Sequence, residues 1–326
     1  MYKTKTMFFL MMIFGTSLTL CSNSWMGMWM GLEINLMSFI PLIKSKTKNT
    51  AEAVIIYFLV QSISSTILMF SIIMSMIYPP SNVLFPLMMA MSLLMKMGAA
   101  PFHMWLPEMM NKLEWNMNIL LMTWQKLGTM IMISNIHMND KFITMTIILS
   151  VMVGAIGGLN QTSLKKILAF SSINHTGWLL SLIKVQNNWM SYLTIYSIMI
   201  TSTCMMFHKY NMMYISQINM MNLTQSEKIS YMTSMMSLGG LPPFIGFLPK
   251  WIAIQTLMMN KSYLLLMLMM MFSMITLFYY MRTMSMLIMS HSTINKWINV
   301  KSNSKIMNVT LIINFSLPMV FMMNFM

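Results

Sequence analysis

The sequence predicts an all-α membrane protein with about eleven transmembrane helices. Three observations favour this class: 57% of the 326 residues are hydrophobic, only 8% are charged, and the mean hydropathy is +0.66. A soluble domain carries roughly 25% charged residues, so this chain could not hide its apolar surface from water. Near-continuous apolar runs recur from Met7 to Met326 and leave no stretch for a soluble domain.

A spanning helix needs about 20 apolar residues. On that criterion the predicted segments are 7–22, 25–43, 52–77, 84–112, 117–136, 142–160, 166–183, 189–208, 228–259, 262–281 and 306–325. The fourth and ninth are long and contain proline and glycine, so we expect two broken helices. We expect a single transmembrane domain over 1–326. Its approximate halves, 1–140 and 141–290, are expected to form a loose inverted repeat, followed by a terminal helix at 306–325.

The basic residues predict the orientation. The net charge is +14, and the lysines cluster in the short gaps between apolar runs, which favours membrane anchors over a nucleic-acid surface. Gaps on the side of the N-terminus carry fourteen basic residues: Lys3, Lys5, Lys44, Lys46, Lys48, Lys112, Lys165, Lys166, Lys209, Lys228, Arg282, Lys296, Lys301 and Lys305. The opposite gaps carry three: Lys141, Lys184 and Lys261. The N-terminus is therefore expected on the inner side and the C-terminus on the outer side.

Four charges fall inside the apolar segments, namely those of Glu33, Lys96, Lys126 and Lys250. Each ion at mid-membrane costs roughly 2.5–3.5 kcal/mol even on the lenient insertion scale. Helix packing does not require them, because small residues and van der Waals contact suffice. A lysine near a span end can instead reach the headgroups, an explanation that suits Lys250 better than Lys96 or Lys126. A neutral, inert buried lysine is a further alternative.

Lysine suits proton transfer, because its pKa of about 10.4 in water can fall by up to 3–5 units on burial and rises again beside a carboxylate. A buried lysine with a movable partner can therefore take up and release a proton near neutral pH. A Glu33–Lys96 pair would lower the cost of both charges.

The two broken helices strengthen this hypothesis. Pro101 follows Gly98-Ala99-Ala100 and has no N–H, so we expect the carbonyl of Met97 to lose its helical partner. In the second break, Gly240, Pro242 and Pro243 are expected to free the carbonyls of Leu238 and Gly239 in the same way. Interrupted helices in corresponding halves point to an ion site. The symmetry is loose, since Lys96 precedes its break and Lys250 follows its own.

Other kinds of site receive little support. The two cysteines, Cys21 and Cys204, are too few for iron–sulfur ligation, and no P-loop, dinucleotide fingerprint or zinc motif is present. His175 lies mid-segment, where it could relay protons or serve as a hydrogen-bonded structural residue.

Five strings carry a resemblance: Trp29–Pro41 (WMGLEINLMSFIP), Lys96–Pro107 (KMGAAPFHMWLP), Met122–Lys126 (MTWQK), Gly154–Lys166 (GAIGGLNQTSLKK) and Gly239–Lys250 (GGLPPFIGFLPK). Together they resemble the subunit 2 family of mitochondrial NADH dehydrogenase, respiratory complex I, in an insect-like form. This is one of the antiporter-like membrane-arm subunits, and the match runs over nearly the whole chain. Bacterial relatives carry three further N-terminal helices that animal versions lack, which agrees with about eleven spans.

The resemblance implies specific roles. Glu33 would pair with Lys96, Lys126 would link two half-channels, Lys250 would face the outer exit, and the polar axis would pass near His175. The sparse axis between Lys126 and Lys250 would need water to bridge it.

The resemblance also implies where the chain works. It would be a non-redox subunit of the proton-translocating NADH:ubiquinone reductase and would bind no cofactor or metal itself. NADH, FMN, the iron–sulfur clusters and ubiquinone would belong to other subunits. Its partners would be other membrane-arm subunits and lipid, including cardiolipin, and it would not exist as an independent monomer. The location would be the mitochondrial inner membrane, with the N-terminus in the matrix and the C-terminus in the intermembrane space.

The composition adds one expectation about synthesis. Methionine, isoleucine, lysine and asparagine are abundant, and the start lacks the arginine of a transit peptide. A mitochondrial location then requires an organelle-encoded chain.

Two alternatives stay open from the residues alone. The first is a free-standing cation/proton antiporter, which the single aspartate, Asp140 in a predicted loop, disfavours. The second is a structural scaffold of the membrane arm, which should tolerate loss of the buried lysines.

Overall fold

The computed structural model describes residues 2–43, 48–78, 84–136, 138–185, 188–220, 224–290 and 304–318. Within these ranges the regular structure is helical, and Ser163 and Tyr214 form one isolated antiparallel bridge. The all-α prediction is thereby confirmed. The chain divides into two compact units, Met1–Ser150 and Val151–Met326.

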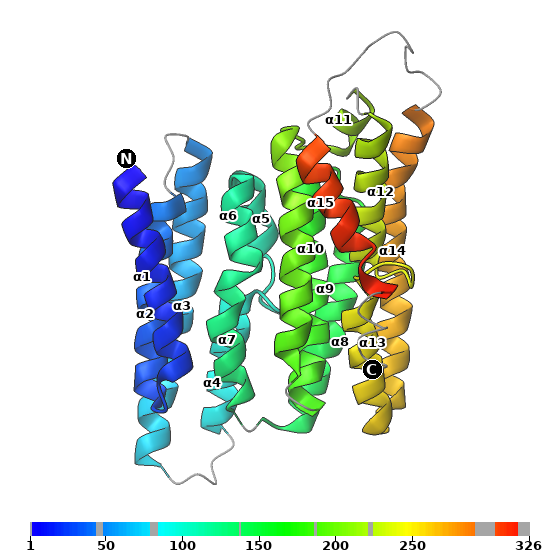
Figure 1. Cartoon of the computed structure of the whole chain (residues 1–326). Helices are drawn as coiled ribbons and strands as arrows, with labels where there is room; N and C mark the ends of the chain where they lie inside the picture. The colour runs from blue at the N-terminus through cyan, green and yellow to red at the C-terminus, as the bar shows by residue number, and fades with distance from the viewer. Residues whose placement is uncertain are drawn as a thin grey trace. The chain divides into compact units, whose positions relative to one another are not determined.

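The first unit contains eight helices or parts of helices among its described residues (Figure 1). They are α1 (Tyr2–Cys21), α2 (Trp25–Ile43), α3 (Lys48–Ile77), α4 (Leu84–Met97), α5 (Trp105–Lys112), α6 (Trp115–Met122), α7 (Trp124–Ser134) and the start of α8 (Asp140–Gly158). Helix α2 packs against α1 and α3, and α3 packs against α4 and α5. Helix α7 contacts α1, α2 and α4, so the segment that carries Lys126 lies against the helices that carry Glu33 and Lys96.

The second unit begins with the end of α8. It continues through α9 (Leu164–Val185), α10 (Trp189–Lys209), α11 (Ile215–Met220), α12 (Gln225–Gly239), α13 (Phe247–Met259), α14 (Tyr263–Ser290) and α15 (Ser304–Asn314). Helix α13 contacts α9, α10 and α14, while α12 contacts α10, α14 and α15. The helix with Lys250 is thus surrounded by three long helices of its own unit.

Each of the eleven predicted segments holds one helix or a broken pair. The fourth contains α4 and α5 and the ninth contains α12 and α13, so both predicted breaks are confirmed. Two features were not predicted: the short α11, and an interruption at Thr123 between α6 and α7. Of the predicted terminal segment 306–325, residues 319–325 lie outside the described ranges.

Five of the described helices, α2, α3, α8, α10 and α14, are long and apolar enough to cross a membrane singly. The exact count of eleven stays a prediction, as does the single domain with halves 1–140 and 141–290. Lys44, Lys46, Lys296 and Lys301 lie outside the described residues, so the orientation stays a prediction too. Lys165 and Lys228, expected as interfacial anchors, lie in the first turns of α9 and α12 and are buried within the chain.

The helices accommodate their many hydroxyl groups locally. Ser64 donates to the carbonyl of Gln61 at 2.8 Å, and Ser71 donates to that of Leu68 at 2.7 Å. Polar groups in lipid must be satisfied inside the protein, and this i to i−3 bond does so within one helix.

Glycines bring α1 and α2 into backbone contact. A Cβ atom on Gly31 would lie 2.7 Å from the carbonyl oxygen of Gly15 and 2.9 Å from the amide nitrogen of Thr19. Both neighbours are backbone atoms and cannot move aside independently. In a membrane, an apolar side chain gains little by exchanging lipid for another helix. Close packing at small residues therefore drives helix association there.

Replacement of Gly31 by valine should therefore separate α1 from α2. Overpacking of a tight core costs about 1–3 kcal/mol, and we expect less of the folded protein in the membrane, with faster degradation. The control is Met30→Val at the neighbouring position, whose side chain is 52% exposed. Equal amounts of both variants would contradict the packing argument.

Candidate proton-transfer site

The first ionic contact predicted from the sequence is present. Glu33 on α2 and Lys96 in the last turn of α4 lie with Oε1 and Nζ 3.7 Å apart. The lysine side chain is 3% exposed and the glutamate side chain 23%. Opposite charges at this distance offset part of each other's burial cost, since an unpaired charge inside a membrane is expensive.

Helix α4 ends one residue after Lys96 in a Schellman motif. Gly98 has φ +70°, the left-handed region that favours glycine. Its N–H donates to the carbonyl of Met95 at 3.2 Å, and the N–H of Ala99 donates to that of Leu94 at 3.1 Å. The break is therefore made at Gly98, before the proline at 101 is reached. This differs from the expectation, in which Pro101 opened a continuing helix at Met97.

A side chain from α3 satisfies the backbone carbonyl of Lys96. The amide Nε2 of Gln61 donates to the carbonyl oxygen of Lys96 at 3.1 Å. Trp105, the first residue of α5, donates its indole N–H to the carbonyl of Met95 at 3.2 Å. The end of α4 is therefore fixed by two polar side chains, and Lys96 is held at a rigid position.

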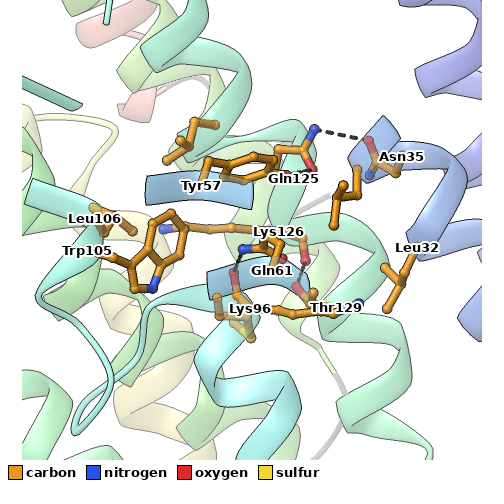
Figure 2. Close-up of a pocket in the computed structure, with 13 residues that line it drawn as sticks. Leu32, Asn35, Tyr57, Gln61, Lys96, Trp105, Leu106, Gln125, Lys126 and Thr129 are labelled. Carbon is orange, nitrogen blue, oxygen red and sulfur yellow. Dashed lines mark hydrogen bonds between the residues drawn. The ribbon is translucent and has the colours of Figure 1, made fainter. Parts of the chain in front are cut away.

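A small cavity, with about 20 Å³ open to the centre of a water molecule, lies beside this helix end. The side chains that surround it come from six helices, α2 to α7, and Figure 2 draws them as sticks. The lining combines apolar side chains with polar ones, the latter being Asn35, Tyr57, Gln61, Lys96, Gln125, Lys126 and Thr129. Because one water needs about 10–15 Å³ of such space, the cavity can hold a single ordered water with several polar partners.

Hydrogen bonds link the polar lining across helices. Tyr57 donates its hydroxyl to Oε1 of Gln125 at 3.4 Å, and Nε2 of Gln125 donates to Oδ1 of Asn35 at 3.0 Å (Figure 2). These contacts join α3, α7 and α2. They orient the amide next to Lys126, so that donors and acceptors face the cavity.

Lys126 is 2% exposed and lines the same cavity as Lys96. It lies three residues after Thr123, where the helix is interrupted with φ −111° and ψ −69°. The Thr123 hydroxyl donates to the carbonyl of Ile119 at 2.7 Å. Interruptions of this kind recur at functional sites. The structure thus brings Glu33, Lys96 and Lys126 together within the first unit.

In the second unit, Lys250 on α13 donates from Nζ to the carbonyl oxygen of Gly239 at 2.7 Å. Gly239 is the last residue of α12, and the following Gly240 has φ +76°. A Cβ atom on Gly240 would lie 2.7–2.8 Å from the end of the Lys250 side chain. Glycine is required there for two reasons. The backbone is left-handed, and any side chain would collide with the end of the Lys250 side chain. The freed carbonyl expected at Gly239 is thus the one that holds the lysine.

Helix α12 ends in the same motif as α4. The N–H of Gly240 donates to the carbonyl of Ser237 at 2.9 Å, and that of Leu241 donates to Met236 at 3.3 Å. Pro242 and Pro243 follow the break, as Pro101 follows the first. Both units therefore contain one broken helix with a left-handed glycine at the break.

His175 is buried in α9, and its Nδ1 lies 2.7 Å from the hydroxyl oxygen of Tyr192 on α10. Which of the two groups donates depends on the tautomer of the imidazole. His175 and Lys250 belong to the second unit, in which α9 packs against α13.

Sequence reasoning missed the amides of Asn35, Gln61 and Gln125 and the phenol of Tyr57. One signal was available, because Tyr57 and Gln61 are four residues apart and therefore share a face of α3. The partners of these groups lie far along the chain, so no local pattern revealed the network.

The comparisons with known proteins agree with this arrangement. Residues 22–276 match the family described as NADH:quinone oxidoreductase/Mrp antiporter, transmembrane. The chain is 42% identical over 324 residues to NADH-ubiquinone oxidoreductase chain 2 of Anopheles gambiae, covering 96% of this chain and 94% of the relative. It is 45% identical over 308 residues to the protein of the same name from Locusta migratoria, covering 92% and 90%.

A solved structure of respiratory complex I from Thermus thermophilus contains a chain of the same fold. The TM-score is 0.78 at 18% sequence identity, and the match covers 95% of this chain and 78% of the other. The antiporter-like fold predicted from the sequence is confirmed. Taken with the two insect relatives, these matches show that the chain belongs to the NADH-ubiquinone oxidoreductase chain 2 family of antiporter-like membrane proteins.

Proposed function

We propose that this chain carries protons across the membrane as a core membrane-arm subunit of NADH:ubiquinone oxidoreductase. The observation that carries the proposal is the buried Glu33–Lys96 pair beside a polar cavity that Lys126 also lines. Electron transfer in other subunits would supply the driving force. NADH, FMN, the iron–sulfur clusters and ubiquinone are proposed to bind there and not to this chain.

The geometry supports a stepwise transfer. A neutral lysine amine accepts a proton and an ammonium releases one, so Lys96 and Lys126 can each hold the proton in turn. Movement of the Glu33 carboxylate toward or away from Nζ changes how strongly Lys96 keeps its proton. Water among the amides of Gln61 and Gln125 would connect the two lysines across the cavity, because amides donate and accept hydrogen bonds at fixed positions.

The geometry of the second unit supports an exit route for protons toward the outer side. Lys250 contacts a backbone carbonyl at a helix end, where the helix dipole favours a positive charge. We propose that Lys250 delivers protons to the outer side and that His175 lies on the route within this unit. The path between the two units is proposed to pass through water.

We further propose a location in the mitochondrial inner membrane, with the N-terminus in the matrix and the C-terminus in the intermembrane space. Other membrane-arm subunits and lipids, including cardiolipin, would cover the exposed apolar faces. The chain would be organelle-encoded and would not function as a separate monomer.

The orientation can be tested with a protease-accessible tag at either end of the chain. Because fourteen basic residues against three favour an inner N-terminus, a C-terminal tag should be cleaved in intact mitoplasts. An N-terminal tag should be cleaved only after the membrane is opened. The opposite pattern would contradict the assignment.

Replacement of Lys96 by methionine should preserve the fold and abolish its step in proton transfer. An unbranched apolar side chain fills similar space without the cost of burying a charge. Replacement by arginine should also impair pumping, because arginine stays charged and cannot release the proton. The measurement is proton uptake per electron in reconstituted complex carrying each variant.

The matched control is Lys112→Met. Lys112 forms a closer ion pair, 2.8 Å from Glu52, but the two side chains are 30% and 59% exposed. An exposed pair contributes only about 0–1 kcal/mol, so its loss should leave pumping unchanged. Normal pumping with both Lys96 variants would show that Lys96 is a tolerated buried charge and would favour a scaffold. Cation exchange by the purified, separate chain would favour an antiporter.

A further inference from the structure

A cluster of phenol groups surrounds His175 in the second unit. Tyr192 and Tyr196 come from α10, and Tyr279 and Tyr280 come from α14. All four tyrosines are at most 2% exposed, and His175 is 4% exposed. The ring centroids of His175 and Tyr196 are 4.6 Å apart, and those of Tyr279 and Tyr280 are 4.7 Å apart.

Helices α10 and α14 bring their phenol groups close enough to interact. The phenols of Tyr192 and Tyr196 interact electrostatically with that of Tyr280, and Tyr279 interacts with Tyr196. The 2.7 Å contact between His175 Nδ1 and the Tyr192 hydroxyl connects the imidazole to the same group. One imidazole and four hydroxyl groups are thus gathered among α9, α10 and α14.

Packing alone does not account for the hydroxyl groups. Those of Tyr279 and Tyr280 are buried and make no hydrogen bond of good geometry, although they interact with each other and that of Tyr280 with Ser171. The Oδ1 atom of Asn174, the neighbour of His175, is also buried without a hydrogen-bond partner among the described protein atoms. Each unsatisfied buried polar group costs about 1–3 kcal/mol. Phenylalanine would fill the same volume without that cost, so packing does not explain why positions 279 and 280 both carry a hydroxyl group.

The cluster lies among the helices that enclose Lys250. Helix α13, which carries Lys250, packs against α9, α10 and α14. A Cβ atom on Gly246, one turn before Lys250, would lie 2.5 Å from the methyl carbon of Met199. Met199 is one turn after Tyr196 on α10. The buried phenols therefore belong to two helices, α10 and α14, that both contact the lysine helix.

We propose that Tyr192, Tyr196, Tyr279 and Tyr280 form, with His175, a hydroxyl relay that conducts protons through the second unit toward Lys250. The relay rests on the proposed proton-carrying function and names residues that supply part of the route. A phenol both donates and accepts a hydrogen bond. It can therefore pass a proton on without itself keeping a charge.

Each step conserves protons and charge. A proton that arrives at Nε2 of His175 makes the imidazole cationic. The Nδ1–H then transfers its proton to the oxygen of Tyr192, whose own O–H proton moves to the next hydroxyl group or to an ordered water. One N–H bond and one O–H bond break, and two O–H bonds form. The net result is one proton advanced, with His175 and Tyr192 both neutral. The histidine suits this role because small changes of environment move its charge across physiological pH.

The test is removal of single hydroxyl groups by Tyr192→Phe and Tyr280→Phe in the assembled complex. The control is Tyr231→Phe on α12, outside the cluster. Tyr231 is 1% exposed, and its ring centroid lies 5.8 Å from that of Phe207. All three variants keep an aromatic ring, so the amount of assembled complex on a native gel should match the wild type. Proton uptake per electron and its solvent deuterium isotope effect are then measured.

We expect both cluster variants to lose proton uptake and to change the isotope effect, while Tyr231→Phe retains the wild-type values. Unchanged uptake in all three variants would overturn the relay. An equal loss in all three would also overturn it, because any buried hydroxyl group would then have the same effect. Lys96→Met separates the two proposals: loss of uptake there, with normal uptake in the tyrosine variants, would reject the relay alone. Normal uptake with Lys96→Met would reject the proposed function itself.

Discussion

A charge placed inside a membrane must find its partner within the protein, and the arrangement of this chain follows from that constraint. Lys96 meets the carboxylate of Glu33 at 3.7 Å, whereas Lys250 meets a backbone carbonyl at 2.7 Å. The carbonyl is available only because α12 ends at Gly239. The helix breaks are therefore part of how the charges are held, and Gly240 is needed for Lys250 as much as for the backbone.

The two units use one backbone device in different ways. Both α4 and α12 end in a Schellman motif with a left-handed glycine, Gly98 or Gly240. In the first unit an amide from a neighbouring helix, that of Gln61, satisfies the carbonyl of Lys96. In the second unit the lysine itself, ten residues after its glycine, satisfies the carbonyl of Gly239. This explains why the symmetry seen in the sequence is loose: the backbone repeats while the capping side chain does not.

The parts that were predictable from the sequence are those with a local cause. Glycine next to proline interrupts a helix wherever it occurs, so both broken segments could be recognised without a structure. An isolated lysine in an apolar run is equally visible, because its burial is costly. The interruption at Thr123 has no glycine or proline beside it, so the neighbouring residues do not predict it. The hydrogen bonds of Gln125 join residues 68 and 90 positions away, and such contacts exist only once the helices have packed.

The partners of the lysines differ between the units in a way that bears on mechanism. Glu227 is the only acidic residue after Ser150 in the sequence. It lies in the first turn of α12, where it caps the helix and pairs with Lys209 at 3.6 Å. Among the described residues of this unit, Lys250 therefore has no carboxylate partner comparable to the one that Glu33 gives Lys96. In the proposed relay, a proton would travel toward Lys250 through His175 and the buried phenol groups around it, without an acidic side chain. In the proposed mechanism, the first unit would therefore control a proton by moving a charge, whereas the second would control it by reorienting hydroxyl groups.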